Sequence, residues 1–241
     1  MTRAVRIGLL GGTLDPIHVG HVETATAARR ALALDRIIVL PSRVPPHRPQ
    51  QPVASRYHRF AMAALAINGV EGLEESDIEL CAPGPSYTAD TLTRFRERSG
   101  LQASQIFFIT GADAFAEIET WYRYPEVIDL SNFVVVSRPG FPVEHLRQRL
   151  PALAGRMVSL GQRTLDSGAR PGAAAESAAI FLVDAATPDV SSTDIRRRLA
   201  AGETVAGLMP PAVERHVFQH RLYASGAAPA LSTADHLHGQ N

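Results

Sequence analysis

The chain lacks the features that mark membrane, secreted and nucleic-acid-binding proteins. A single cysteine, Cys81, rules out a disulfide within the chain and fits a reducing compartment. No apolar run approaches the roughly 20 residues of a membrane span, and the N-terminus lacks the apolar segment of a signal peptide. The 24 basic and 24 acidic residues cancel, so no overall field attracts nucleic acid. We therefore expect a cytoplasmic protein that binds neither membrane nor nucleic acid.

Two common phosphate-binding signatures are also absent. The sequence contains no G-x-x-x-x-G-K-[ST] and no G-x-G-x-x-G after a strand, which excludes a P-loop enzyme and a typical dinucleotide dehydrogenase. Hydrophobic residues make up 45% of the 241 positions, enough for one substantial core. We expect a single domain over residues 1–223, with a flexible loop at 162–177 and a flexible tail at 224–241.

Short apolar runs alternate with segments of helical periodicity. The predicted strands are Val5–Leu10, Arg36–Leu40, Ser76–Leu80, Gln105–Thr110, Phe133–Ser137, Met157–Leu160 and Ile180–Val183. The predicted helices are Gly20–Leu34, Ser55–Asn68, Thr88–Ser99, Asp113–Glu117, Tyr124–Ser131, Ser192–Ala201 and Pro211–Gln219. This alternation predicts an α/β, Rossmann-like, doubly wound fold with a mostly parallel sheet and helices on both faces. Ligands of such sheets bind beyond the carboxyl ends of the strands.

The most informative segment, residues 11–21, follows the first predicted strand and reads Gly-Gly-Thr-Leu-Asp-Pro-Ile-His-Val-Gly-His. A strand that breaks at glycines and continues as a helix leaves free backbone N–H groups beside a helix N-terminus, which favours a bound phosphate. His18 and His21 lie three residues apart at that helix start, so they can face one anionic group together. A tight turn with structural histidines is the alternative, but the ordered combination favours a phosphate-transfer site.

A second segment, late in the chain, reads Val-Ser-Ser-Thr-Asp-Ile-Arg and ends at Arg196. Ser191 and Asp194 have the spacing of a capping box. The same helix start presents N–H groups and the hydroxyls of Ser192 and Thr193, where a phosphate can bind. Arg196 lies one turn further on and can reach the same anion, whereas the two arginines that follow are expected to face solvent.

The middle of the chain holds further candidates for binding an anion, a ribose or an aromatic ring. A Pro-rich loop carries Arg43, His47 and Arg48, which can hold a phosphate, although a basic surface loop is the simpler interpretation. Asp113 follows a predicted strand and can accept hydrogen bonds from ribose hydroxyls. The only tryptophan, Trp121, can stack on a base or pyridine ring, or can pack in the core. Further candidates are Tyr87 and Thr88 at a helix start, Tyr122, and Arg138 at a strand end.

Together these segments resemble the bacterial nicotinate-nucleotide adenylyltransferases, in the nucleotidyltransferase superfamily with the H-x-G-H motif. The first segment resembles that superfamily's first signature, and the late one resembles I-S-S-T-x-I-R with Val190 in place of Ile. The patterns P-P-H-[KR], S-Y-T-x-x-T, G-x-D, W-Y and R-P-G occur in the family's order, and the likeness covers most of residues 5–222. Leu14 replaces a frequent Phe, Arg48 replaces a common Lys, and Arg43 stands where small or amide side chains are common.

The resemblance implies adenylyl transfer from ATP to nicotinate mononucleotide, giving deamido-NAD and pyrophosphate by direct in-line attack. It implies that catalysis uses His18, His21 and Arg196. It implies that ATP is bound by Gly11, Gly12, Thr13, His18, His21, Gly111, Asp113, Ser191, Ser192, Thr193 and Arg196. It implies that the mononucleotide is bound by Asp15, Arg43, His47, Arg48, Tyr87, Thr88, Trp121, Tyr122 and Arg138. Mg²⁺ is expected to arrive with the ATP phosphates, without a set of protein ligands.

Several alternatives stay open at this point. The acceptor can be nicotinamide mononucleotide or phosphopantetheine instead, or the chain can be a nucleotide-binding module without turnover. The oligomeric state is not fixed by the sequence, and a homo-oligomer is one alternative. His216 and His220 lie one helical turn apart, but the sequence supplies no third ligand at a suitable spacing, so solvated histidines are expected there rather than a metal site.

Overall fold

A computed structural model describes residues 4–46, 53–160 and 178–224. The predicted flexible loop and, apart from Ala224, the predicted tail lie outside the described residues. Two of the predicted mononucleotide-binding residues, His47 and Arg48, also lie outside them.

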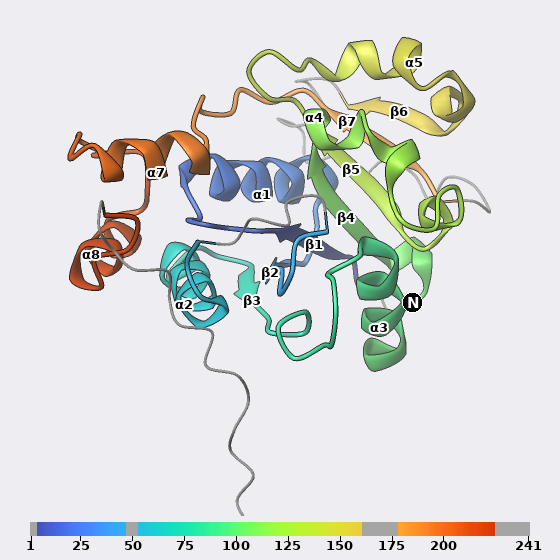
Figure 1. The fold of residues 1–241 in the computed structure, drawn as a ribbon. Coiled ribbons are helices and arrows are strands. Elements are labelled where there is room, and N and C mark those ends of the chain that lie inside the picture. The colour runs from blue at the N-terminus through green and yellow to red at the C-terminus, as the bar shows by residue number, and fades with distance from the viewer. Residues whose placement is uncertain (1–3, 47–52, 161–177, 225–241) are drawn as a thin grey trace, which may run out of the picture.

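A seven-stranded sheet forms the centre of the molecule, and all of its strand pairings are parallel (Figure 1). The strands are β1 (Ile7–Gly12), β2 (Arg36–Pro41), β3 (Leu73–Glu75), β4 (Ile106–Gly111), β5 (Asn132–Val136), β6 (Met157–Leu160) and β7 (Ile180–Val183). Their order is β3-β2-β1-β4-β5-β7-β6. The chain first winds from β1 towards β3 and then from β4 towards the opposite edge, so the topological switch point lies between β1 and β4.

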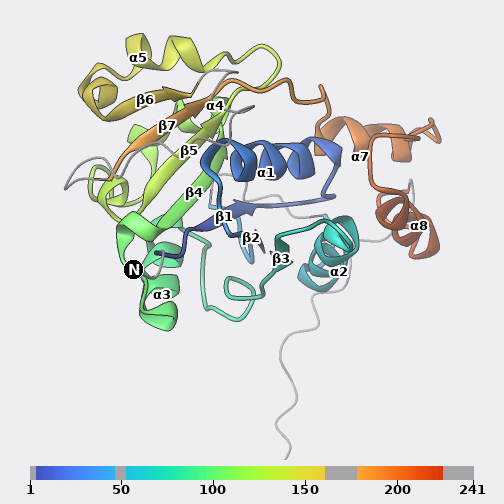
Figure 2. The ribbon, with the colours of Figure 1, turned by 180° about the vertical axis from the view of Figure 1, so that it is seen from behind.

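Helices cover both faces of the sheet, as the doubly wound prediction requires. The α-helices are α1 (Val19–Leu32), α2 (Arg56–Ile67), α3 (Thr88–Ser99), α4 (Ala112–Phe115), α5 (Leu146–Arg149), α7 (Ser192–Ala200) and α8 (Pro211–Gln219). The 3-10 helices are Ala103–Gln105, Ile118–Thr120, Glu126–Asp129, Val143–His145 and Pro151–Arg156. Figures 1 and 2, seen from opposite sides, place α1 and α3 on opposite sides of the sheet.

Each face of the sheet has its own hydrophobic core. Residues of α1, α2, α7 and α8 pack on one face, where Leu10 of β1 is buried. Residues of α3, α4 and α5 pack on the other face, where Ile7 and Leu9 of the same strand are buried. The alternation along β1 follows from the two-residue period of a strand. Because β1 is buried on both sides, its carboxyl end is held firmly where the first motif begins.

Two predicted elements are wrong. The predicted strand Ser76–Leu80 is a turn, and the edge strand is instead β3, a few residues earlier. Ile78 and Leu80 are buried in that turn, so their alternating apolar side chains imitate a strand. The predicted helix Tyr124–Ser131 is reduced to a 3-10 helix at Glu126–Asp129, because β5 begins only three residues later.

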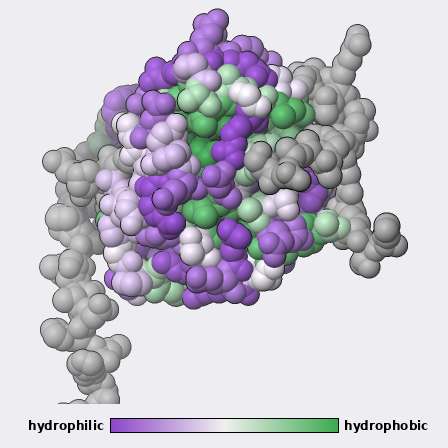
Figure 3. Space-filling view, turned by 90° about the vertical axis from the view of Figure 1, so that its right-hand side faces the viewer, coloured by the Kyte–Doolittle hydropathy of each residue, from purple (hydrophilic) through white to green (hydrophobic). Residues whose placement is uncertain are grey.

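The surface of the described residues is mixed in character. Figure 3 shows hydrophobic patches separated by hydrophilic side chains on the face that it presents. None of the described helices combines the length and the apolar character needed to cross a membrane.

Candidate functional site

A cleft of about 530 Å³ lies at the carboxyl ends of β1 and β4, beside the switch point. Both predicted motifs and most of the mid-chain candidates contribute to its walls. The predicted site residues that line it are Gly11, Gly12, Thr13, His18, His21, Tyr87, Thr88, Gly111, Asp113, Trp121, Tyr122, Arg138, Ser191, Ser192 and Thr193. The cleft lies where parallel sheets of this topology bind their ligands.

The two histidines of the first motif face each other at the start of α1. Their ring centroids are 3.8 Å apart, and the backbone N–H of His18 donates to Nδ1 of the His21 ring at 3.2 Å. His18 Nδ1 is buried and has no hydrogen-bond partner among the described residues. A buried polar atom without a partner costs free energy unless a ligand or water satisfies it. The pair is therefore arranged to receive a polar group from the cleft.

Burial keeps both imidazoles neutral. It lowers the pKa of His18 from 6.5 to about 3, with a smaller contribution from Arg138. Burial also lowers the pKa of His21 well below its usual 6.5. The nearby His18 and Arg138 lower it further, by smaller amounts. A neutral imidazole can still donate one N–H to a phosphate oxygen. An anion bound beside the rings would favour the imidazolium form and raise both pKa values.

The late motif contacts the first motif directly, although nearly the whole chain separates them. Ser192 Oγ donates to the carbonyl of Pro16 at 2.9 Å, and Arg196 donates to the carbonyl of Asp15 at 2.7 Å. Arg196 also donates to Thr193 Oγ1 at 3.3 Å. It does not itself line the cleft. The start of α7 and the start of α1 thus share one end of the cleft.

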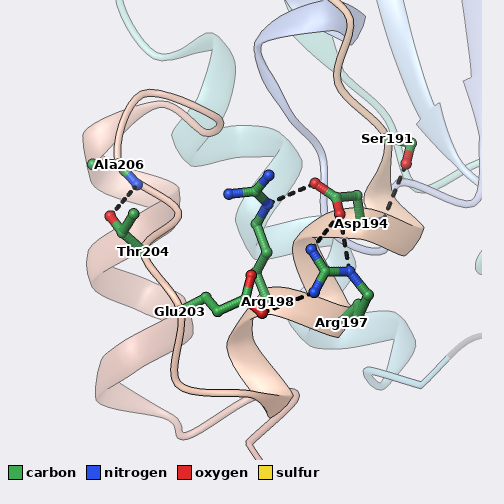
Figure 4. A network of polar contacts seen from close by, with 7 residues as sticks. All are labelled: Ser191, Asp194, Arg197, Arg198, Glu203, Thr204 and Ala206. Atoms are coloured by element: carbon green, nitrogen blue, oxygen red, sulfur yellow. Dashed lines mark hydrogen bonds and ion pairs between the residues drawn. The ribbon is translucent and has the colours of Figure 1, made fainter.

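Half of the predicted capping box is present at the start of α7. Ser191 Oγ accepts from Asp194 N–H at 3.1 Å. The Asp194 carboxylate instead accepts from Arg197 at 2.9 Å and from Arg198 at 2.7 Å (Figure 4). Arg197 is exposed, as expected, and Arg198 is partly buried. These ion pairs offset part of the positive charge of the two arginines.

Asp113, at the start of α4, offers the cleft a free acceptor. Its Oδ1 is buried and has no hydrogen-bond partner among the described residues. Gly111 makes room for this arrangement, because a Cβ there would lie 2.4 Å from Asp113 Oδ1 and 2.8 Å from Arg138 Cδ. Arg138 donates to the carbonyl of Val190 at 3.5 Å and lines the cleft near the late motif. A carboxylate with an unused acceptor suits a ligand hydroxyl.

Aromatic rings form another part of the wall. Tyr87 and Tyr122 are stacked, with centroids 4.4 Å apart and an interplanar angle of 30°. Trp121 is half-buried and contacts Phe108 edge-on at 6.2 Å while lining the cleft. Stacking on a ligand and packing in the core were the two alternatives for this ring. Trp121 packs against the core on one side and lines the cleft on the other. Such rings can hold a flat heterocycle.

Two predicted mononucleotide-binding residues, Asp15 and Arg43, do not line the cleft. The Asp15 side chain is buried, and its oxygens accept from Val53 N–H at 2.7 Å and Ala54 N–H at 3.1 Å. Arg43 turns its guanidinium to the carbonyl of Ala82 at 2.8 Å. Both side chains hydrogen-bond to backbone groups of neighbouring loops. The sequence pattern could not distinguish this structural role from ligand binding.

Three further residues, none of them predicted from the sequence, hold the site together. Arg59 is fully buried in α2 and donates to the carbonyls of Thr13 at 2.8 Å and Arg43 at 3.3 Å. Tyr223 donates its hydroxyl to Asp15 Oδ1 at 2.7 Å. Glu79, buried in the turn mistaken for a strand, lines the cleft and accepts from Thr91 Oγ1 at 2.8 Å. Arg59 follows Arg56 and His58 at the polar start of α2, so its sequence context gives no signal of its burial.

Comparison with known proteins agrees with this geometry. A model of the cytidylyltransferase-like family matches residues 9–198. The chain belongs to this family. A relative from Desulfatibacillum aliphaticivorans is 36% identical over 228 residues, covering 91% of this chain and 100% of the relative. A relative from Chromohalobacter salexigens is 38% identical over 226 residues, covering 92% and 97%. Both relatives are named probable nicotinate-nucleotide adenylyltransferases.

Among solved structures, the chain is similar to the Plasmodium falciparum nicotinic acid mononucleotide adenylyltransferase complexed with NaAD. The TM-score is 0.69 at 17% identity, with 91% of this chain and 97% of the other covered. At that level of identity the likeness concerns the fold, and it confirms the Rossmann-like nucleotidyltransferase fold expected from the sequence.

Proposed function

We propose that this chain transfers the adenylyl group of ATP to nicotinate mononucleotide, forming deamido-NAD and pyrophosphate. The observation that carries the proposal is the contact between the two motifs at one end of the cleft, through Arg196 with Asp15 and Ser192 with Pro16. This contact gathers two helix N-termini and two imidazoles around one space, and Arg196 supports the edge of that space without lining it. Such a space suits a triphosphate. Relatives bearing that name, 36% and 38% identical over 91% and 92% of this chain, support the same reaction.

The reaction needs positioning and charge neutralisation more than acid–base chemistry. A phosphate oxygen of the mononucleotide attacks the α-phosphorus of ATP in line, and the bond to the bridging oxygen of the β-phosphate breaks. The nucleophile is already anionic at neutral pH, so no general base is required. His18 and His21 would donate N–H groups to the triphosphate, and the start of α7 with Arg196 would hold the leaving pyrophosphate.

The remaining walls fit the two nucleosides. Asp113 would accept from the adenosine ribose, since its Oδ1 has no other described partner. The Tyr87, Trp121 and Tyr122 rings would bound the pyridine ring, with Arg138 near the mononucleotide. The role of His47 and Arg48 in holding the mononucleotide phosphate stays a prediction.

The start of α3 favours nicotinate over nicotinamide. Tyr87 occupies the N-cap but gives the helix no side-chain hydrogen bond, and Thr88 lines the cleft. Uncapped N–H groups at a helix N-terminus attract a carboxylate more strongly than a neutral amide.

Mg²⁺ would enter with ATP. In the part of the chain that the structure describes, the carboxylates of the cleft are not gathered into a group of three that could share an ion. When bound, the ion would neutralise charge on the phosphates, and the protein residues would contact the phosphates rather than the metal.

Steady-state kinetics on a panel of acceptors tests this proposal. Pyrophosphate release from ATP is measured with nicotinate mononucleotide, nicotinamide mononucleotide and phosphopantetheine. We expect the highest kcat/KM with nicotinate mononucleotide. A higher value with either other acceptor overturns the substrate assignment. Calorimetric binding of ATP with no pyrophosphate release from any acceptor overturns the enzymatic assignment in favour of a nucleotide-binding module.

A further inference from the structure

Three histidines from two helices meet outside the cleft. His58 lies in the first turn of α2, where its N–H donates to Ser55 Oγ at 3.3 Å. His216 lies in α8 and His220 caps the end of that helix, one turn later. Each ring offers a nitrogen, and these nitrogens all lie within 4.8 Å of one another. The sequence indicated only the pair on α8, because His58 is distant along the chain and the fold alone brings it there.

We propose that His58, His216 and His220 form a three-imidazole site for a divalent transition metal, and that the ion it binds best is Zn²⁺. Tetrahedral Zn²⁺ holds imidazole nitrogens at about 2.0–2.1 Å, which places them about 3.3 Å apart. His58 Nδ1 and His216 Nε2 are already 3.1 Å apart. His220 is exposed and its ligand nitrogen lies within 4.8 Å of the other two, so metal binding would require its side chain to turn towards them.

The ring packing supports this assignment. The centroids of His216 and His220 are 4.4 Å apart, and those of His58 and His220 are 4.9 Å apart. Nitrogen ligands alone, with no carboxylate in the group, suit a borderline metal such as Zn²⁺ rather than Mg²⁺ or Ca²⁺. Burial and the neighbouring imidazoles lower the pKa of both His58 and His216 below 6.5, so both rings are neutral and able to ligate at pH 7.

A metal at this position would cross-link two parts of the chain that are far apart in sequence. Helices α2 and α8 pack against each other, with α8 close to the end of the described chain (Figure 1). None of the three histidines lines the cleft. The site therefore stabilises the fold and leaves the fourth metal position open to water, without joining the proposed adenylyl transfer.

Metal titration of the full-length, untagged protein tests the site. After chelator treatment and dialysis, Zn²⁺ binding is measured by calorimetry, and Co²⁺ binding by the visible absorption typical of tetrahedral cobalt. We expect one ion per chain and a rise in melting temperature of several degrees with excess Zn²⁺, because the ion binds only the folded state. His220→Ala and His58→Ala should each weaken binding at least roughly tenfold. His220→Gln serves as a second variant that retains side-chain bulk.

Two controls separate this site from other histidines. His145→Ala removes an exposed histidine outside the cluster and should leave Zn²⁺ affinity unchanged. The double variant His236→Ala with His238→Ala removes two histidines near the end of the sequence and should also leave it unchanged. Absence of stoichiometric binding overturns the proposal. So does equal affinity in the parent and the folded His220→Ala and His220→Gln proteins, or loss of binding in the His236/His238 variant.

Discussion

Single residues in the cleft carry much of the proposed chemistry, and the charge state of two of them is unusual. The chain contains no lysine, so every fixed positive charge that could meet a phosphate is an arginine. His18 and His21 add hydrogen-bond donors rather than fixed charge, because burial holds the pKa of each below the physiological range. Neutral donors impose little repulsion on each other before the triphosphate arrives.

Replacing His21 by Ala tests its proposed part in stabilising the transition state. The variant loses one donor to the triphosphate, and we expect kcat to fall roughly 10²–10³-fold with little change in folding. Pyrophosphate release gives kcat, and circular dichroism checks that the variant is folded. Near-normal turnover in the folded variant would remove His21 from the catalytic residues.

Trp121→Ala tests whether this ring contacts the mononucleotide. Loss of an aromatic wall should raise KM for the mononucleotide several-fold, with a smaller effect on KM for ATP. Tyr124→Ala is the matched control, because Tyr124 packs against the same hydrophobic core but does not line the cleft. An unchanged KM in Trp121→Ala would assign the ring to packing against Phe108.

Among the elements, the loop between β1 and α1 is held in an uncommon conformation. Leu14 has a φ of 52°, which non-glycine residues rarely adopt, and its side chain is buried. Such a conformation persists where its surroundings hold it. Here Arg59 donates to the carbonyl of Thr13, and Arg196 to that of Asp15. The loop thus depends on two helices far apart in sequence, α2 and α7.

Arg59→Met tests this support. Removing a buried guanidinium leaves several carbonyls without donors, and we expect a loss of roughly 3 kcal/mol in the free energy of unfolding. Chemical denaturation measures that loss. Arg36→Met is the control, since its ion pair with Glu74 is about half exposed and should contribute little. A loss no greater than in the control would show that Arg59 does not hold the loops.

Elements with strong local signals could be predicted from the sequence. Helices α1 and α7, both rich in motif residues, begin within one residue of their predicted starts. The edge strand β3 could not be predicted, because two of its three residues are exposed glutamates while the following turn is buried. Likewise, the local sequence around Asp15 gives no sign that its partner is Tyr223, 208 positions away. Long-range polar pairing leaves no local periodicity to detect.

On the scale of the whole molecule, the buried histidines make the fold sensitive to acid. The folded-state pKa of His18, about 3, lies below its usual 6.5, so the unfolded chain binds the extra proton first as pH falls. Stability is therefore complete above pH 6.5 and declines below it, by up to about 1.4 kcal/mol per pH unit for this group. His21 acts in the same direction.

Denaturant titrations between pH 7.5 and 5 measure this decline. We expect the free energy of unfolding to fall steadily below pH 6.5, by roughly 2 kcal/mol at pH 5 from His18 alone. In a folded His18→Asn variant the slope should be shallower. Identical slopes in the parent and the variant would contradict the assigned pKa shift.

The hydroxyl of Tyr223 on the Asp15 carboxylate has a consequence for how the protein is made. A ribosome synthesises Asp15 208 residues before Tyr223, so the nascent chain carries the motif-bearing loop long before the partner of its carboxylate exists. Nucleotide binding would then have to wait until Tyr223 is made, and a translation product ending ahead of Tyr223 would bind both substrates poorly.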